Sequence, residues 1–113
     1  MSPITTHVLD VAKGQPAKGI SVVLEYFAGS DWEELARGVT NEDGRIANLL
    51  PDTTALRAGT YRINFATESY FHKCGVKGFY PNVPVIFEIH DTAQHYHVPL
   101  LLSPYGYSTY RGS

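Results

Sequence analysis

The chain has 113 residues, of which 43% are hydrophobic and 18% are charged, and its formal net charge is −2. This length suits one domain with its own core, so we expect a single domain over residues 1–113. The nine Lys and Arg residues are scattered, which argues against a nucleic-acid partner, and no stretch approaches the roughly 20 apolar residues of a membrane span. The N-terminus has no leader-like segment, which predicts a cytoplasmic protein. The one cysteine, Cys74, excludes an intrachain disulfide and is expected to be a structural residue.

Alternating apolar residues predict short strands along most of the chain. Residues 4–11 come first, with Ile4, Thr6 and Val8 on one face and Thr5, His7 and Leu9 on the other. Each later strand is predicted from a row of apolar residues at every second position. In chain order, these rows are Ile20, Val22, Leu24 and Tyr26; Tyr61, Ile63 and Phe65; Val83, Val85, Phe87 and Ile89; and Tyr96, Val98, Leu100 and Leu102.

Turn signals separate these strands at residues 12–19, 41–44 and 103–106. Residues 49–60 are predicted to be a loop with, at most, a short edge strand. One segment, 67–75, is predicted as a helix that has Thr67 as its N-cap and ends at Gly75. About seven or eight short strands separated by turns predict an all-β sandwich.

Polar residues inside or beside strands are the candidates for chemistry, and they leave three alternatives open. His7, His95 and His97 could form a three-histidine metal site of the catalytic zinc type. Alternatively, a histidine could activate water without a metal, with Arg45 nearby to keep the imidazole neutral and to stabilise an oxyanion. The third alternative is a binding surface without catalysis. The residues by themselves do not separate catalysis from binding.

Three segments carry a resemblance to a known family: "THVLDVAKGQPAKGI" at 6–20, "NEDGRI" at 41–46 and "HYHVPLLLSPYGYSTYRGS" at 95–113. Over essentially the whole chain, the sequence resembles the hydrolase branch of the transthyretin-like family. The final Tyr-Arg-Gly-Ser is the specific mark of that branch. A carrier of small aromatic ligands, such as a hormone, is the alternative from the other branch, which lacks this ending.

The resemblance implies a transthyretin-like, eight-stranded antiparallel β-sandwich with one short helix. It also implies a homotetramer, a dimer of dimers, with its sites between subunits. The expected reaction is hydrolysis of 5-hydroxyisourate to 2-oxo-4-hydroxy-4-carboxy-5-ureidoimidazoline in urate degradation. Water attacks a ring amide, and no metal or organic cofactor is needed.

Site residues carried over by position fall into two groups. The catalytic group is His7, Arg45, His97 and Ser113, and the substrate-binding group is His7, Arg45, Tyr110, Arg111 and Gly112. Either His7 or His97 removes the proton of water, and His7 is favoured. Arg45 is expected to bind the anionic substrate and to lower the imidazole pKa values. His95 is expected to lie behind the site or at the surface.

Overall fold

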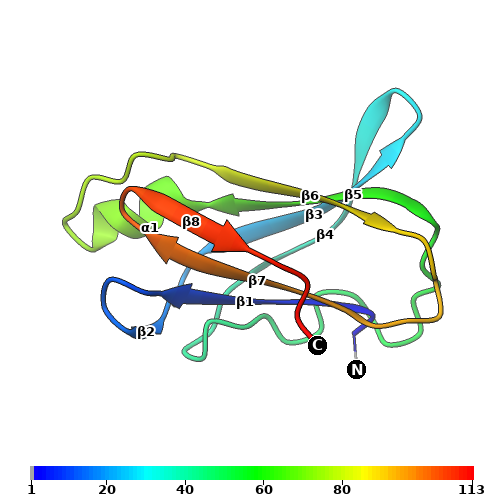
Figure 1. Cartoon of the computed structure of the whole chain (residues 1–113), viewed down its shortest axis with the longest axis horizontal. Coiled ribbons are helices and arrows are strands. Elements are labelled where there is room, and N and C mark those ends of the chain that lie inside the picture. The colour runs from blue at the N-terminus through cyan, green and yellow to red at the C-terminus, as the bar shows by residue number, and fades with distance from the viewer. Residues whose placement is uncertain (1) are drawn as a thin grey trace.

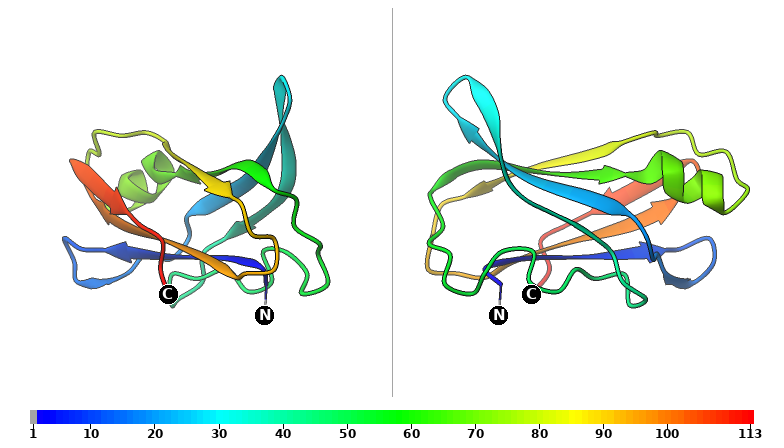
Figure 2. Two further views of the ribbon diagram at one scale, coloured as in Figure 1. Left: turned by 45° about the vertical axis from the view of Figure 1, so that its right-hand side comes forward. Right: turned by 180° about the vertical axis from the view of Figure 1, so that it is seen from behind.

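The computed structural model describes residues 2–113 as two four-stranded sheets with one short helix (Figures 1 and 2). One sheet has the order β2-β1-β7-β8 and the other the order β4-β3-β5-β6. The predicted sandwich with one helix is therefore confirmed. In chain order, the elements are β1 (Ile4–Asp10), β2 (Gln15–Pro16), β3 (Ser21–Ala28), β4 (Asp31–Val39), β5 (Gly59–Ala66), α1 (Thr67–Lys73), β6 (Val83–Ile89), β7 (Tyr96–Ser103) and β8 (Gly106–Thr109).

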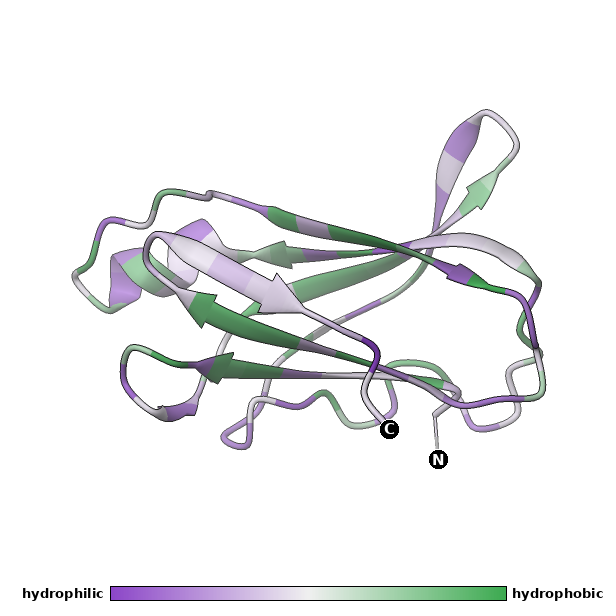
Figure 3. Ribbon diagram, viewed as in Figure 1, coloured by the Kyte–Doolittle hydropathy of each residue, from purple (hydrophilic) through white to green (hydrophobic). Residues whose placement is uncertain are grey.

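The core lies between the two sheets and is built from the predicted apolar faces. Figure 3 shows apolar residues along β1 and β7 and along β3, β5 and β6 of the other sheet, whereas β8 is pale. Ile63 of β5 and Leu100 of β7 have no exposed surface. Of the predicted rows, only Tyr26 and Phe87 are half-buried rather than buried. Because side chains alternate along a strand, burying one face turns His7 and His97 outward.

One strand pair differs from the expected antiparallel arrangement. β1 and β7 are parallel, with Thr5 opposite His97 and His7 opposite Pro99. Parallel neighbours need a long connection, and here the whole second sheet and the helix lie between the two strands in sequence. This pairing brings the first strand beside the histidine-bearing strand near the end of the chain.

β4 and β2 are among the strands that the apolar rows did not predict. β4 is mostly exposed and rich in charged residues, and with β3 it forms the hairpin that projects from the sandwich in Figure 2. β2 has only two residues and lies inside the stretch predicted as a turn. Residues 49–58 contain no strand, as the loop prediction expected.

The helix begins at Thr67, which corrects the prediction that Thr67 is its N-cap. The N-cap is Ala66, which makes no side-chain capping hydrogen bond. Instead, the Thr67 hydroxyl donates to the carbonyl oxygen of Tyr80 over 2.6 Å. Gly75 follows the helix with a φ of +70°, as expected for a residue that ends it. Within residues 2–113, no helix is both long and apolar enough to cross a lipid bilayer.

Candidate active site

His7 and His97 lie on the outer face of the β2-β1-β7-β8 sheet, and both are half-buried. His7 belongs to β1 and His97 to β7, and the two are offset by two residues in the parallel pair, because His7 is opposite Pro99 and Thr5 is opposite His97. The sheet therefore presents two imidazoles on neighbouring strands. The register of the two strands is enough to place both side chains on the same face.

Arg45 reaches the same site through a tight turn at residues 41–44. The Asn41 side-chain oxygen accepts the backbone N–H of Arg45 over 3.1 Å, and the Asn41 N–H donates to the Arg45 carbonyl oxygen over 2.8 Å. Arg45 then forms an isolated bridge with His7, and the Val8 N–H donates to the Gly44 carbonyl oxygen. The turn thus fixes the backbone of an exposed arginine directly beside β1.

The turn that positions Arg45 beside β1 requires a glycine at position 44. Its φ is +73°, which side chains rarely tolerate, and a Cβ atom here would collide with the carbonyl oxygen of Val8. The same Cβ would lie 3.3 Å from Cδ2 of His7. The turn backbone therefore passes against the His7 ring with no room for a side chain.

His97 is held by a hydroxyl and surrounded by positive or ionisable groups. The Thr5 hydroxyl lies 2.8 Å from Nδ1 of His97 and 3.1 Å from Nε2 of His95. Burial lowers the pKa of His97, and the charge of Arg45 and the neighbouring His7 and His95 lower it further. Each cause disfavours a positive imidazolium and so favours the neutral form of His97, which can accept a proton.

The terminal segment, residues 110–113, places its glycine against His97. Gly112 forms an isolated bridge with His97, and its N–H donates to the His97 carbonyl oxygen over 2.8 Å. A Cβ atom on Gly112 would lie only 2.6 Å from Cδ2 of the ring. Close contact with the ring therefore explains this glycine, whose φ is not positive. Tyr110 and Ser113 are exposed on either side of it.

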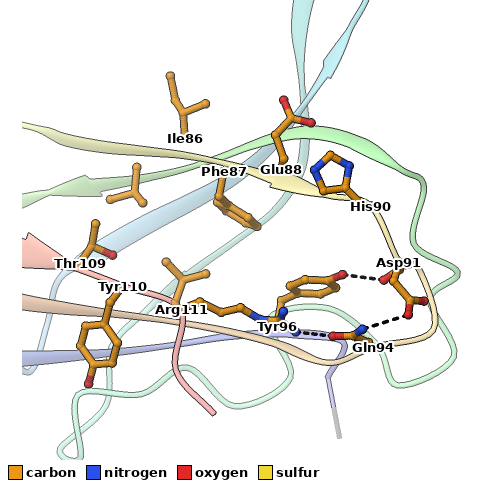
Figure 4. Close-up of a pocket in the computed structure, with 12 residues that line it drawn as sticks. Ile86, Phe87, Glu88, His90, Asp91, Gln94, Tyr96, Thr109, Tyr110 and Arg111 are labelled. Atoms are coloured by element: carbon orange, nitrogen blue, oxygen red, sulfur yellow. Dashed lines mark hydrogen bonds between the residues drawn. The ribbon is translucent and has the colours of Figure 1, made fainter.

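Within residues 2–113, Arg111 meets the histidine cluster through the backbone, since its guanidinium donates to the carbonyl oxygen of His95 over 3.4 Å. Its guanidinium lies 4.4 Å from the ring centre of Tyr96, which belongs to the core face of β7, and donates to the Gln94 side-chain oxygen over 2.6 Å. Figure 4 shows Arg111 extending toward Tyr96 and Gln94, while Tyr110 points the other way. Arg111 therefore anchors the terminal segment from the face opposite to His97.

A cavity of about 400 Å³ lies between β6 and the terminal segment (Figure 4). Its wall includes Phe87, Tyr96 and Arg111, and none of the three clustered histidines or Arg45 lines it. The chemistry-bearing groups instead lie on the outer face of the sheet. We place the candidate site there, because that face brings Arg45 beside His7 and carries His97, the histidine whose pKa is lowered.

The structure offers no support for the three-histidine metal alternative. Within residues 2–113, no three His, Cys, Asp or Glu side chains converge in a way that could hold a metal ion. His95 and His97 meet through the Thr5 hydroxyl. Cys74 is at the end of α1, where the Lys13 ammonium lies 3.2 Å from its sulfur, so it is remote in the fold from this site.

Thr5 and Gly44 were not predicted as site residues. The signal for Thr5 was present, since Thr5 and His7 share one strand face, but its partner His97 is 92 residues away. The signal for Gly44 was its position just before Arg45 in a turn sequence. Neither contact follows from local sequence, because both depend on which strand lies beside β1.

Comparison with known proteins places this fold and site in a family. Residues 4–112 match the HIUase/Transthyretin family. A relative from Rhizobium meliloti, described as 5-hydroxyisourate hydrolase 2, is 50% identical over 115 residues, which cover 97% of this chain and 95% of the relative. The chain therefore belongs to the HIUase/Transthyretin family.

Solved structures from both branches of the family superpose on the chain. The 5-hydroxyisourate hydrolase of Klebsiella pneumoniae has a TM-score of 0.84 and 37% identity, with 97% of this chain and 98% of that chain covered. Sea bream transthyretin in complex with thyroxine has a TM-score of 0.90 and 34% identity, with 97% and 94% covered. The fold is thus common to a hydrolase and to a transthyretin in complex with thyroxine, so the fold alone does not distinguish the two branches.

Proposed function

We propose that this protein hydrolyses 5-hydroxyisourate in urate degradation. The observation that carries the proposal is the meeting of His7, His97 and Arg45 on one sheet face, with burial and nearby charge lowering the pKa of His97. The 50% identity to a relative named as this hydrolase supports the same substrate. A purely apolar carrier surface would have no need of a neutral imidazole beside an arginine.

The reaction needs three events at the substrate. Water adds to a ring amide carbonyl, the C–N bond breaks, and the departing nitrogen takes up a proton. A base must remove one proton from water, and a cation must stabilise the negative charge that develops on the carbonyl oxygen. Arg45 is the cation in this proposal, since its guanidinium is permanently charged and can also bind an anionic substrate.

His97 is the base in our proposal, and His7 orients the substrate or returns the proton to the departing nitrogen. This assignment reverses the preference drawn from the sequence, which favoured His7. The reason is the lowered pKa of His97, because a base has to be neutral before it can accept a proton. Nδ1 of His97 is engaged by Thr5, which leaves Nε2 as the accepting atom.

The terminal segment closes one side of this site. Gly112 lies on the His97 ring, and Tyr110 and Ser113 flank it, so we propose that these two side chains contact the substrate. Arg111 fixes the segment from behind through Tyr96 and Gln94 rather than touching the substrate within its own chain.

We also propose a homotetramer, a dimer of dimers, with its sites between subunits. The support from the structure is that the candidate site is on an outer sheet face, with Arg45 exposed and Tyr110 55% exposed. Catalysis by preorganised charges works best where water is excluded, and a second subunit on this face would exclude it.

Following the ultraviolet absorbance of freshly prepared 5-hydroxyisourate tests the function. Because this compound also decays spontaneously, the expected result is faster loss and an optically active product. A His97→Asn variant should lose roughly 100- to 10,000-fold in catalysed rate. No acceleration by the folded wild-type protein, together with retention of thyroxine on a binding assay, would contradict the hydrolase and favour a carrier.

A further inference from the structure

We infer that Thr5 is a positioning residue that sets the tautomer of His97 and couples it to the tautomer of His95. The inference builds on the proposed function, in which Nε2 of His97 accepts the proton of water. It concerns a hydroxyl that touches both imidazoles: Oγ1 lies 2.8 Å from Nδ1 of His97 and 3.1 Å from Nε2 of His95. Thr5 also lies directly opposite His97 in the parallel pair.

A count of protons restricts this arrangement. A threonine hydroxyl has one proton to donate and two lone pairs to accept with, so it can donate to only one of the two rings. Each of the two hydrogen bonds needs one proton. At least one of the rings must therefore carry its N–H on the nitrogen that faces Thr5.

The role of His97 as the base requires that His97 is the ring with its N–H facing Thr5. If Nε2 of neutral His97 is to accept a proton, the single N–H of that ring must be on Nδ1. Nδ1 then donates to the Thr5 oxygen, and the Thr5 proton is free for Nε2 of His95. The result is a directed chain, from Nδ1–H of His97 to Thr5 and from the Thr5 O–H to His95.

The local structure suits a fixed hydroxyl. Threonine is branched at Cβ, which restricts its χ1 angle in a strand and holds Oγ1 in place. On the opposite edge of the His97 ring, the Gly112 backbone lies so close that an added Cβ would be 2.6 Å from Cδ2. The ring is thus held between Thr5 and Gly112, and within residues 2–113 it is Nε2 that neither of these contacts engages.

Thr5 also affects the charged state of His97. After His97 accepts a proton, its Nδ1–H still donates to Thr5, and an acceptor for the charged form stabilises that form. The ionisable groups that face His97 are His7 from β1, Arg45 from the turn segment and His95 from the residues before β7, and each lowers its pKa. The terminal segment adds Gly112 at the ring, which carries no charge. Thr5 therefore opposes these three groups.

The test compares Thr5→Val with Thr5→Ser and with the matched control Thr6→Val. Thr6 is the next residue in β1 but faces the core, where its hydroxyl donates to the Val98 carbonyl oxygen over 2.6 Å. Thr5→Val should lower kcat/KM by roughly three- to tenfold, the factor expected for one hydrogen bond. It should also move the acidic limb of the pH profile to lower pH. Thr5→Ser should keep kcat/KM and the acidic limb close to their wild-type values. Thr6→Val should change thermal stability but leave the pH profile in place.

Long-range proton–nitrogen NMR of 15N-histidine-labelled protein reads the tautomers without substrate. The wild type should show His97 with its N–H on Nδ1, and Thr5→Val should show a mixture. His95→Ala should move His97 toward the Nε2–H form, because the Thr5 proton loses its acceptor at His95. Since no substrate is used, this readout stands even if the hydrolase assay fails.

Three results would overturn the inference. The first is a wild-type His97 that carries its N–H on Nε2. The second is a tautomer that is the same in the wild type and Thr5→Val, with both proteins folded by circular dichroism. The third is an unchanged His97 tautomer in His95→Ala, which would remove the coupling to His95.

Discussion

Gly112 matters because the absence of a Cβ atom leaves room for the His97 ring. A Cβ atom at this position would lie 2.6 Å from Cδ2 of His97, well inside van der Waals contact, and the other edge of the ring is held by Thr5. A methyl group would therefore push the ring away from its place. Displacing a catalytic group by about 1 Å can cost roughly 100-fold in rate.

We accordingly expect Gly112→Ala to lower kcat/KM by roughly 100-fold while the protein stays folded. Gly106→Ala is the matched control at the start of β8, because the nearest atom to its added Cβ is Ser103 Oγ at 3.9 Å. Steady-state kinetics and thermal unfolding of both variants give the comparison. Equal losses of activity in the two variants would contradict a specific contact with His97.

Arg45 influences His97 through its charge, and this makes a prediction about pH. Removing the charge in Arg45→Gln should raise the pKa of His97 toward its ordinary value, because Arg45 is the second cause of the depression, after burial. The acidic limb of kcat/KM should then move to higher pH, in addition to a loss of rate. Arg37→Gln is the control, since Arg37 is on β4 and pairs with Glu34. An NMR titration of His97 that is the same in Arg45→Gln and the wild type would refute the effect.

The lowered pKa of His97 also predicts how the stability of the fold depends on pH. A histidine whose pKa is lower in the folded state binds fewer protons than the unfolded chain does near its ordinary pKa. The contribution of His97 to stability is therefore complete above the unfolded value of about 6.5 and is lost as the pH falls below it. Arg45→Gln should weaken this acid sensitivity.

At the scale of elements, the terminal segment, residues 110–113, connects the two faces of the first sheet. Gly112 contacts His97 on the outer face, and Arg111 contacts Tyr96 on the core face. Deleting the segment should lower kcat/KM by roughly two to four orders of magnitude through lost positioning. The core strands do not include it, so far-ultraviolet circular dichroism should still show a folded sandwich.

Arg111→Ala separates anchoring from contact with the substrate. The loss of one cation–π contact at an exposed site should cost about 0.5–1 kcal/mol of stability, with a smaller rate loss than the deletion. A rate loss in Arg111→Ala as large as that of the deletion, at unchanged stability, would instead place Arg111 in the substrate site.

The sequence predicts the strands that bury one face, because such strands have apolar residues at every second position. It misses β4, whose exposed position at the sheet edge leaves no apolar row, and β2, which is too short to show a period. For the site, the residues His7, Arg45 and His97 follow from the resemblance. The Thr5 bridge and the rearward direction of Arg111 do not, because both depend on contacts between segments that are distant in sequence.

At the scale of the whole molecule, the proposed assembly predicts a particle of about 50 kDa, four times the chain mass of 12.5 kDa. Several aromatic side chains near the β8 edge would otherwise remain in water, including Phe79 at 67% and Tyr105 at 75% exposure. Light scattering on the purified protein measures the mass. A stable monomer with full activity would contradict both the tetramer and a site shared between subunits.

The parallel pairing of β1 with β7 also governs when activity can arise during synthesis. Thr5 and His97 are 92 residues apart, so the chain must close a loop of nearly its full length before the two meet, which is a slow step in folding. The second sheet can form from residues 21–89 while β1 still lacks its main neighbour. A nascent chain of that length would carry an unpaired apolar edge, which invites aggregation, and the groups of the candidate site would come together only after β7 had left the ribosome.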